Sequence, residues 1–156
     1  MPRVTDIMIM GQTEQDTLTV RTRTKVTDLP RLVGQVYPKL FAYLAELGEI
    51  PMDMPFITYY NMDMNDLDVE VGVPVSKTLP PRGEMAAGRI PEGKAVVCMF
   101  RGSYADTEST YNEMWKWAAD NNLRPAGTAR EHYFNDPMSF PESELLTKIV
   151  LTLSDR

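Results

Sequence analysis

The feature that most constrains the fold of this chain is the stretch Tyr111–Leu153, which predicts an aromatic helix followed by two strands. Its first part spaces apolar side chains three and four residues apart, which places them on one face of a helix predicted over 106–121. Glu131 and Tyr133 then alternate with their neighbours, as side chains on a half-buried strand do. The helix is therefore predicted to cover one face of strands that carry aromatic and charged groups.

The same order of elements occurs in the first half of the chain. An amphipathic helix is predicted over 29–47, with Asp28 as its side-chain cap and Gly48 at its end, and it precedes two predicted strands as in the second half. The second-half helix is predicted to end at Asn121-Asn122. Aligning 37–61 with 111–135, at an offset of 74 residues, gives five identities in 25 positions. The identical pairs are Tyr37 and Tyr111, Ala45 and Ala119, Pro51 and Pro125, Tyr59 and Tyr133, and Asn61 and Asn135. An offset of 78 then aligns the last strands of the two halves.

This repetition indicates an internal duplication. We predict a single domain over 1–156, made of pseudo-repeats of about 1–78 and 79–156. Each repeat has the order strand, helix, strand, strand, and two such modules can join into one antiparallel sheet with two helices. The predicted fold class is therefore α+β.

Composition limits the partners of this domain. The formal net charge of −6 disfavours direct binding to nucleic acid, because phosphate contacts need clustered Lys and Arg. No apolar run approaches the ~20 residues of a membrane-spanning helix, and the N-terminus lacks a signal-peptide pattern. Cys98 is the only cysteine, so no intrachain disulfide can form, and we expect a cytoplasmic protein.

The residues that usually bind metals and phosphates are sparse. The chain has one histidine, His132, and one cysteine, far apart in the sequence. Asp63, Asp66 and Asp68 lie close together but lack the glycine and final glutamate of a calcium loop, so a solvated turn is the better interpretation. No glycine-rich phosphate loop is present. We therefore expect neither a metal ion nor a cofactor.

The informative residues are aromatic side chains close to strand carboxylates. A carboxylate inside a strand costs desolvation free energy unless it is paired or faces a groove. Aromatic faces beside such a carboxylate suit a flat, apolar, cationic ligand. Glu70 and Glu131 are the carboxylates, and the aromatic residues are Tyr59, Tyr60, Trp115, Trp117 and Tyr133. The alternative is that the aromatic side chains form the core between helix and sheet while the carboxylates face water.

Several short segments, taken in order, resemble the GyrI-like small-molecule-binding domain. This family also forms the effector-binding region of some AraC-type and MerR-type transcription regulators. The segments are Asp68-Val-Glu-Val-Gly-Val-Pro-Val75, Ile90-Pro-Glu-Gly-Lys-Ala95, Phe100-Arg-Gly-Ser-Tyr104, Tyr111-x-x-x-Trp115 and Glu131-x-Tyr-x-Asn-Asp-Pro137.

The resemblance implies two modules around a central groove that takes hydrophobic, often cationic or planar compounds. Family members usually carry a glutamate in the last strand that meets the charge of the ligand. Lys148 occupies that position here, whereas its counterpart in the first half, Glu70, is retained. An anionic or neutral ligand therefore becomes credible; alternatively, Lys148 pairs with Glu70 or Glu131. The predicted ligand-binding residues are Tyr59, Glu70, Trp115, Glu131, Tyr133 and Lys148.

Three functional hypotheses follow from this resemblance. The first is a stand-alone domain that senses or sequesters a small hydrophobic or aromatic molecule, with any DNA-binding part on another chain. The second is a hydrolase of reactive cyclopropane-containing or other electrophilic compounds, with Glu131 or Glu70 as the base and Tyr133 as a hydrogen-bond donor. The third is a module that binds a protein partner, as the gyrase-inhibiting members of the family do. The oligomeric state stays open.

Overall fold

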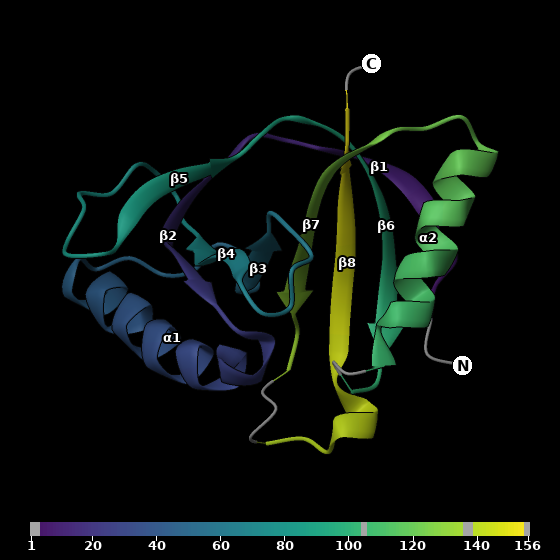
Figure 1. Cartoon of the computed structure of the whole chain (residues 1–156). Coiled ribbons are helices and arrows are strands. Elements are labelled where there is room, and N and C mark those ends of the chain that lie inside the picture. Colours follow the sequence, from purple (N-terminus) through teal and green to yellow (C-terminus); the bar gives the residue numbers. More distant parts are fainter. Residues whose placement is uncertain (1–3, 104–105, 136–138, 155–156) are drawn as a thin grey trace. The chain divides into compact units, whose positions relative to one another are not determined.

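The computed structural model describes residues 4–103, 106–135 and 139–154, which form eight strands and two α-helices (Figure 1). Tyr104, Asp136 and Pro137 of the family-like segments lie outside the described residues. The chain divides into two compact units: Met1–Gln12 with Gly93–Arg156 (unit 1), and Thr13–Glu92 (unit 2). Each unit combines a helix with antiparallel strands, so the predicted α+β class is confirmed. No helix in the described part of the chain is long and apolar enough to cross a membrane.

Unit 2 is a four-stranded sheet in the order β3-β4-β2-β5, with α1 packed against β2 and β4. Its elements are β2 (Gln15–Thr24), α1 (Leu29–Glu46), β3 (Phe56–Tyr59), β4 (Leu67–Pro74) and β5 (Ala86–Ile90). Val20 of β2 pairs with Val71 of β4 on the face that also carries the buried Leu18 and Val73. The opposite face carries the exposed Arg21 and Arg23, so the apolar face is the one that α1 covers.

Unit 1 has the corresponding strand order, β1-β6-β8-β7, with α2 over one face. Its elements are β1 (Met8–Gln12), β6 (Gly93–Arg101), α2 (Glu108–Asp120), β7 (Pro125–Tyr133) and β8 (Leu146–Leu153). Met114 and Ala118 of α2 pack with alternate residues of β6, β7 and β8 in one buried cluster. That cluster contains Val96, Cys98, Phe100, Ala129, Ile149 and Leu151. A smaller cluster on the opposite face contains Ala95, Val97 and Val150.

The helix ends follow the sequence signals, with one correction. Gly48 has a φ of 70° just after α1, and Asn122 has a φ of 58° just after α2, so both occupy the left-handed conformation that ends helices. Asp28 precedes α1 as predicted, but its side chain does not cap the helix. It forms an ion pair with Arg31 instead, with Oδ1 3.2 Å from Nη2. The predicted side-chain cap is therefore wrong.

One pair of identical residues makes the same two hydrogen bonds in both units. In each case a side-chain amide donates to one backbone carbonyl and accepts from the backbone N–H two residues further along. Asn61 bonds Asp66 and Asp68, both at 3.0 Å, and Asn135 bonds Glu144 and Leu146, both at 2.8 Å. Each amide therefore fixes the loop that leads into the last strand of its repeat.

The strand register relates the two units by the offsets found in the sequence. Thr58 pairs with Glu70 in unit 2, and His132 pairs with Lys148 in unit 1. These pairs correspond at the offsets of 74 and 78 residues found in the sequence, and the internal duplication itself stays a prediction. The unit boundary at 92/93 lies beyond the repeat boundary expected near 78/79, because β5 pairs with β2 in unit 2.

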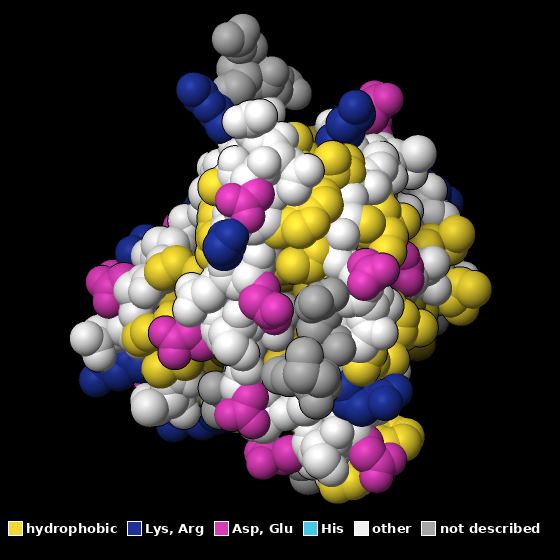
Figure 2. All heavy atoms as spheres, turned by 90° about the vertical axis from the view of Figure 1, so that its right-hand side faces the viewer, with side chains coloured by type: hydrophobic (Ala, Val, Ile, Leu, Met, Phe, Trp, Pro, Cys, Tyr) yellow, Lys and Arg dark blue, Asp and Glu magenta, His cyan; other side chains and the backbone are white. Residues whose placement is uncertain are grey.

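The outer strand of unit 1 is apolar and exposed. Met8, Ile9 and Met10 of β1 have exposed fractions of 42%, 44% and 43%. β1 pairs with β6 along one edge and forms the first strand of the unit. Figure 2 shows the side of the molecule that lies on the right in Figure 1. Hydrophobic side chains gather in the upper middle of this view, and charged side chains surround them (Figure 2).

Candidate functional site

The two faces of each sheet separate the predicted ligand-binding residues. Side chains alternate between the faces of a strand, so positions of like parity share a face. In unit 1, Glu131 pairs with Ile149 of the helix-side cluster, whereas Lys148 pairs with His132 on the opposite face. Glu131 and Tyr133 therefore lie on the α2 side of the sheet, and Lys148 lies on the helix-free face.

Glu131 is the centre of a hydrogen-bonded cluster beneath α2. Its side chain is buried, and both carboxylate oxygens accept hydrogen bonds from phenol hydroxyls. Tyr111 of α2 donates to Oε2, and Tyr133 of β7 donates to Oε1 at 3.0 Å. Trp115, one helical turn after Tyr111, packs against the core cluster as a partly buried residue. Three of the predicted residues thus belong to the same side of unit 1.

Burial changes the protonation of this carboxyl group. Desolvation raises the pKa of Glu131, because a carboxylate is poorly stabilised away from water, and the bonds from Tyr111 and Tyr133 lower it in part. A carboxyl of this kind holds its proton to higher pH than an exposed glutamate does. It can therefore exchange a proton with a bonded hydroxyl or a nearby reactant.

The corresponding residues of unit 2 show what is particular to Glu131. Tyr37, at the position equivalent to Tyr111, donates to the backbone carbonyl of Phe56 at 2.6 Å. The position equivalent to Glu131 holds Ile57, which is buried. The helix tyrosine is thus present in both units, and it donates to a backbone carbonyl in unit 2 and to a carboxylate in unit 1.

Glu70 forms a second cluster, on the helix-free face of unit 2. The Tyr60 hydroxyl donates to Oε1 at 2.5 Å, and the Thr19 hydroxyl donates to Oε2 at 2.8 Å. Burial, together with the bond to Glu70, raises the pKa of Tyr60 to about 12, so the phenol stays a donor at neutral pH. A Cβ atom added to Gly88 would lie 3.2 Å from Oε2, so β5 approaches the carboxylate closely.

An arginine extends this cluster. The Arg21 guanidinium lies 3.8 Å from the centroid of the Tyr60 ring and makes two hydrogen bonds to Asp68, at 3.1 and 2.9 Å. The Asp68 bonds fix the guanidinium over the ring in cation–π geometry. The helix-free face of unit 2 therefore presents a half-buried carboxylate beside an aromatic ring whose far side is covered by a cation.

Tyr60, rather than the predicted Tyr59, is the aromatic partner of Glu70. Tyr59 pairs with Val69, which belongs to the helix-side face, so Tyr59 and Glu70 lie on opposite faces of the unit 2 sheet. Strand parity could have identified Tyr60, because the Tyr60 backbone N–H bonds the Asp68 carbonyl and continues the register of β3. The identity between Tyr59 and Tyr133 marks the repeat rather than the partner of Glu70.

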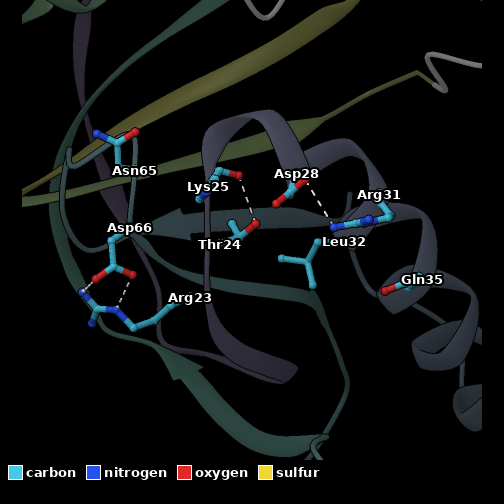
Figure 3. A pocket seen from close by; sticks show the side chains of 9 residues that line it. All are labelled: Arg23, Thr24, Lys25, Asp28, Arg31, Leu32, Gln35, Asn65 and Asp66. Carbon is cyan, nitrogen blue, oxygen red and sulfur yellow. Dashed lines mark hydrogen bonds and ion pairs between the residues drawn. The ribbon is translucent and has the colours of Figure 1, made fainter.

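A polar pocket of about 400 Å³ lies elsewhere in unit 2, near the start of α1 (Figure 3). Four of its charged side chains form two ion pairs (Figure 3): Arg23 with Asp66 at 2.9 Å, and Arg31 with Asp28 at 3.2 Å. The residues that line it are Arg23, Thr24, Lys25, Asp28, Arg31, Leu32, Gln35, Asn65 and Asp66. It contains none of the six predicted residues and only one apolar side chain, so it offers no surface for aromatic stacking.

The sequence profile of the GyrI-like small molecule binding domain matches residues 6–154. The chain belongs to the GyrI-like family. Among curated proteins, none matches this GyrI-like chain in sequence. The family assignment therefore rests on the profile and agrees with the fold.

Solved structures share the GyrI-like fold at low sequence identity. EcmrR in a complex with DNA has a TM-score of 0.84 and 18% identity, covering 97% of this chain and 58% of the EcmrR chain. The isolated EcmrR C-terminal domain has a TM-score of 0.78 and 17% identity, covering 97% and 98% of the two chains. This GyrI-like chain thus spans a little over half of EcmrR. At such identities the likeness shows the fold alone.

Two further solved structures with this fold are a hydrolase and a protein bound to an organic cation. A hydrolase from Listeria innocua has a TM-score of 0.72 and 15% identity, covering 98% of this chain and 93% of the hydrolase. SAV2435, bound to tetraphenylphosphonium, has a TM-score of 0.62 and 6% identity, covering 97% and 95%. The same fold thus occurs in a protein found in a complex with DNA, in a protein described as a hydrolase and in a protein bound to tetraphenylphosphonium.

Proposed function

We propose that this chain is a ligand-binding domain that senses or sequesters a small hydrophobic or aromatic molecule. The observation that carries the proposal is the family match over 6–154, which covers nearly the whole described chain. Glu70 and Tyr60 of unit 2 and Lys148 of unit 1 supply charged and aromatic side chains on sheet faces that the helices do not cover. The likeness to EcmrR, described in a complex with DNA, supports a link to transcription regulation.

The arrangement of Glu70 explains how a ligand would be recognised in unit 2. Tyr60 and Thr19 hold the carboxylate in place, so little side-chain entropy is lost when a ligand binds there. The half-buried position strengthens electrostatic interactions relative to open solvent. A ligand with a cationic or hydrogen-bond-donating group and a flat apolar body fits this carboxylate and the neighbouring ring.

A thermal-shift screen of planar cationic, neutral and anionic aromatic compounds tests the proposal. A compound that binds the folded state raises the melting temperature in proportion to its occupancy. Compounds that raise it should then give saturable isotherms by calorimetry and be recovered unchanged after incubation. If no compound of any charge class binds at millimolar concentration, the proposal is wrong.

A second candidate function is hydrolysis of an electrophilic compound, and the Glu131 cluster is the observation that favours it. A buried carboxyl with a raised pKa, bonded to two phenols, has the chemistry of a general base that directs water to an electrophile. Tyr133 would donate a hydrogen bond to the developing negative charge. The fold likeness to a Listeria innocua hydrolase accords with this role.

Turnover of a cyclopropane-containing electrophile separates the two functions. If the Glu70→Gln variant hydrolyses the compound and the Glu131→Gln variant does not, the protein is an enzyme and Glu131 is its base. Binding without product formation would assign the domain as a sensor. Glu70→Gln is the matched control because it makes the same chemical change in a cluster on the helix-free face of the other unit.

A further inference from the structure

Exposed methionines occur in pairs that the proposed function does not use. At three places two methionines are separated by one residue, and we call these Met-X-Met pairs: Met8-Ile-Met10, Met52-Asp-Met54 and Met62-Asp-Met64. All six side chains are exposed, with exposed fractions from 37% to 54%. The other methionines that the structure describes are half-buried or buried: Met85, Met99 and Met114. Exposure of methionine in the described chain therefore coincides with the paired spacing.

The thioether sulfur gives these pairs a specific chemistry. It is a soft, polarisable donor that selects Cu(I), whereas Mg²⁺, Ca²⁺ and Mn²⁺ prefer oxygen ligands. In the described part of the chain, no three His, Cys, Asp or Glu side chains gather into a group that could hold a metal ion. Cys98, the one thiol of the sequence, is buried. The exposed thioethers are therefore the soft ligands that an ion in solution can reach.

The spacing of each pair allows both sulfurs to reach one ion. Cα atoms two residues apart are separated by at most about 7 Å, whatever the backbone conformation. Methionine is unbranched and has three rotatable side-chain bonds, so two such side chains can bring their sulfurs together. Met8 and Met10 show the relation directly, because both lie in β1 and side chains two residues apart share one face of a strand. A Met-X-Met pair can thus act as a chelate.

Met62-Asp-Met64 lies in the loop between β3 and β4, and hydrogen bonds hold this loop in place. The Val26 N–H donates to the Met64 carbonyl at 2.9 Å. The Asp63 carboxylate accepts from the Asn65 N–H at 3.0 Å, so it stays within its own loop. The two thioethers therefore extend into solvent from a backbone that is already fixed.

Met52-Asp-Met54 has the same arrangement in the loop before β3. The Met52 N–H donates to the Pro74 carbonyl at 2.9 Å, and the Asp53 carboxylate accepts from the Met54 N–H at 2.7 Å. Among the described side chains, neither Asp53 nor Asp63 has an ion-pair partner. Each of these two pairs thus encloses a negative charge that attracts a cation.

One cation lies within electrostatic reach of Asp63. This is Arg23, whose guanidinium makes two hydrogen bonds to Asp66, at 2.9 and 3.0 Å. The charge of Arg23 is therefore balanced by Asp66, and the attraction of Asp63 for a further cation is retained.

We propose that Met52-Asp-Met54 and Met62-Asp-Met64 each bind one soft monovalent metal ion, Cu(I) or its analogue Ag(I), through their two thioether sulfurs. The enclosed aspartate contributes its negative charge. Met8-Ile-Met10 has the two sulfurs without the carboxylate, so it binds the same ion more weakly. This metal site is independent of the proposed small-molecule function, because it uses none of the six predicted ligand-binding residues.

Ag(I) is the first probe, because it has the charge of Cu(I) and does not oxidise. Silver nitrate in chloride-free buffer is titrated into the whole chain labelled with ¹³C at the methionine methyl groups. This readout separates binding at each thioether from binding at the buried thiol. The methyl signals of the two Met-Asp-Met pairs should shift first and saturate together. Those of Met8 and Met10 should need about fivefold more free Ag(I), since a carboxylate ~4 Å from a monovalent cation strengthens its binding by about that factor in water.

Substitution by leucine removes sulfur and keeps the apolar bulk. The double variant Met62→Leu with Met64→Leu should lose the response of its own loop and keep that of the other Met-Asp-Met pair. The single variant Met64→Leu should weaken binding at Met62 at least tenfold, because one thioether cannot chelate. The matched control is Met85→Leu with Met99→Leu, which makes the same change at isolated positions and should leave every paired response as in the wild type.

The choice of ion and the isolated methionines decide the result. Mg²⁺ should shift no methionine methyl signal, and Cu(I) supplied as its acetonitrile complex under nitrogen should reproduce the shifts seen with Ag(I). If paired and isolated methionines respond alike, or if no methyl signal shifts at millimolar free Ag(I), the proposal is wrong. An undiminished response of Met62 in Met64→Leu would refute the chelate. Shifts with Ag(I) but none with Cu(I) would refute the assignment of copper.

Discussion

Removing the Tyr111 hydroxyl should destabilise the protein more at high pH than at low pH. The hydroxyl donates to Glu131, a buried carboxyl whose pKa is raised by desolvation. Above that pKa the acceptor is ionised and such a bond contributes ~1.5–3 kcal/mol, whereas with a neutral acceptor it contributes ~0.5–1.5 kcal/mol. We therefore expect Tyr111→Phe to lower the free energy of unfolding by about 1–2 kcal/mol more above the pKa of Glu131 than below it.

The sign of this pH dependence follows from proton linkage. The Tyr111 bond favours the ionised carboxylate, so its loss raises the folded-state pKa of Glu131 further above the value in the unfolded chain. Between these two values the folded variant binds a proton that the unfolded chain releases. Stability then falls as pH rises, because the folded state binds more protons than the unfolded state. The loss is complete once pH exceeds the folded-state pKa of the variant.

Urea denaturation at several pH values between about 4.5 and 8.5 measures the effect. Tyr37→Phe is the matched control, because the Tyr37 hydroxyl donates to the backbone carbonyl of Phe56, which does not ionise. The cost of Tyr37→Phe should be constant across this range. In a Glu131→Gln background the pH dependence of Tyr111→Phe should disappear. Parallel profiles for the two tyrosine variants, or a slope that survives Glu131→Gln, would refute the role assigned to Glu131.

Three further predictions concern charge and backbone. Lys148→Glu should bind planar organic cations about tenfold or more tightly than the wild type does, because the lysine repels a nearby cation by roughly 1–4 kcal/mol. Neutral aromatic compounds should bind the variant and the wild type with equal affinity. Titration of a fluorescent cationic dye at two salt concentrations measures the difference. Gly72→Ala should cost about 2 kcal/mol or more by urea denaturation, because its Cβ would lie 2.4 Å from Cγ2 of Thr19 and 2.8 Å from the Leu18 carbonyl. Gly34→Ala should instead stabilise α1 by ~0.5–1 kcal/mol, since its Cβ would meet nothing within 4 Å.

The fold could be predicted because the residues that repeat also perform a structural task. Asn61 and Asn135 are identical because each amide fixes the loop before the last strand of its repeat. Tyr37 and Tyr111 are identical because each hydroxyl ties its helix to the strand that follows. Residues with such local tasks recur at a constant offset, so element order and register could be derived from the sequence.

The candidate site was harder to predict because it depends on which face each strand presents. Sequence spacing places Tyr59 and Tyr60 equally close to Glu70, and only the pairing of Tyr59 with Val69 assigns Tyr59 to the helix side. The contact between Gln12 and Arg130 joins residues 118 positions apart. No local pattern in the sequence indicates such a contact, since it arises from the order of four strands in one sheet.

The two charged positions of unit 1 should act independently, because the sheet separates them. Glu131 lies among tyrosines on the α2 side, whereas Lys148 lies beside His132 on the opposite face. Substitutions at sites without shared partners usually have additive effects on stability. Glu131→Gln should therefore alter the pH dependence of unfolding without changing the preference for anions over cations, and Lys148→Glu should do the reverse. The changes in stability and in ligand affinity of the double variant should equal the sums for the two single variants. A departure from these sums would mean that Glu131 and Lys148 interact with each other or with the same ligand, and the two positions would then not act independently.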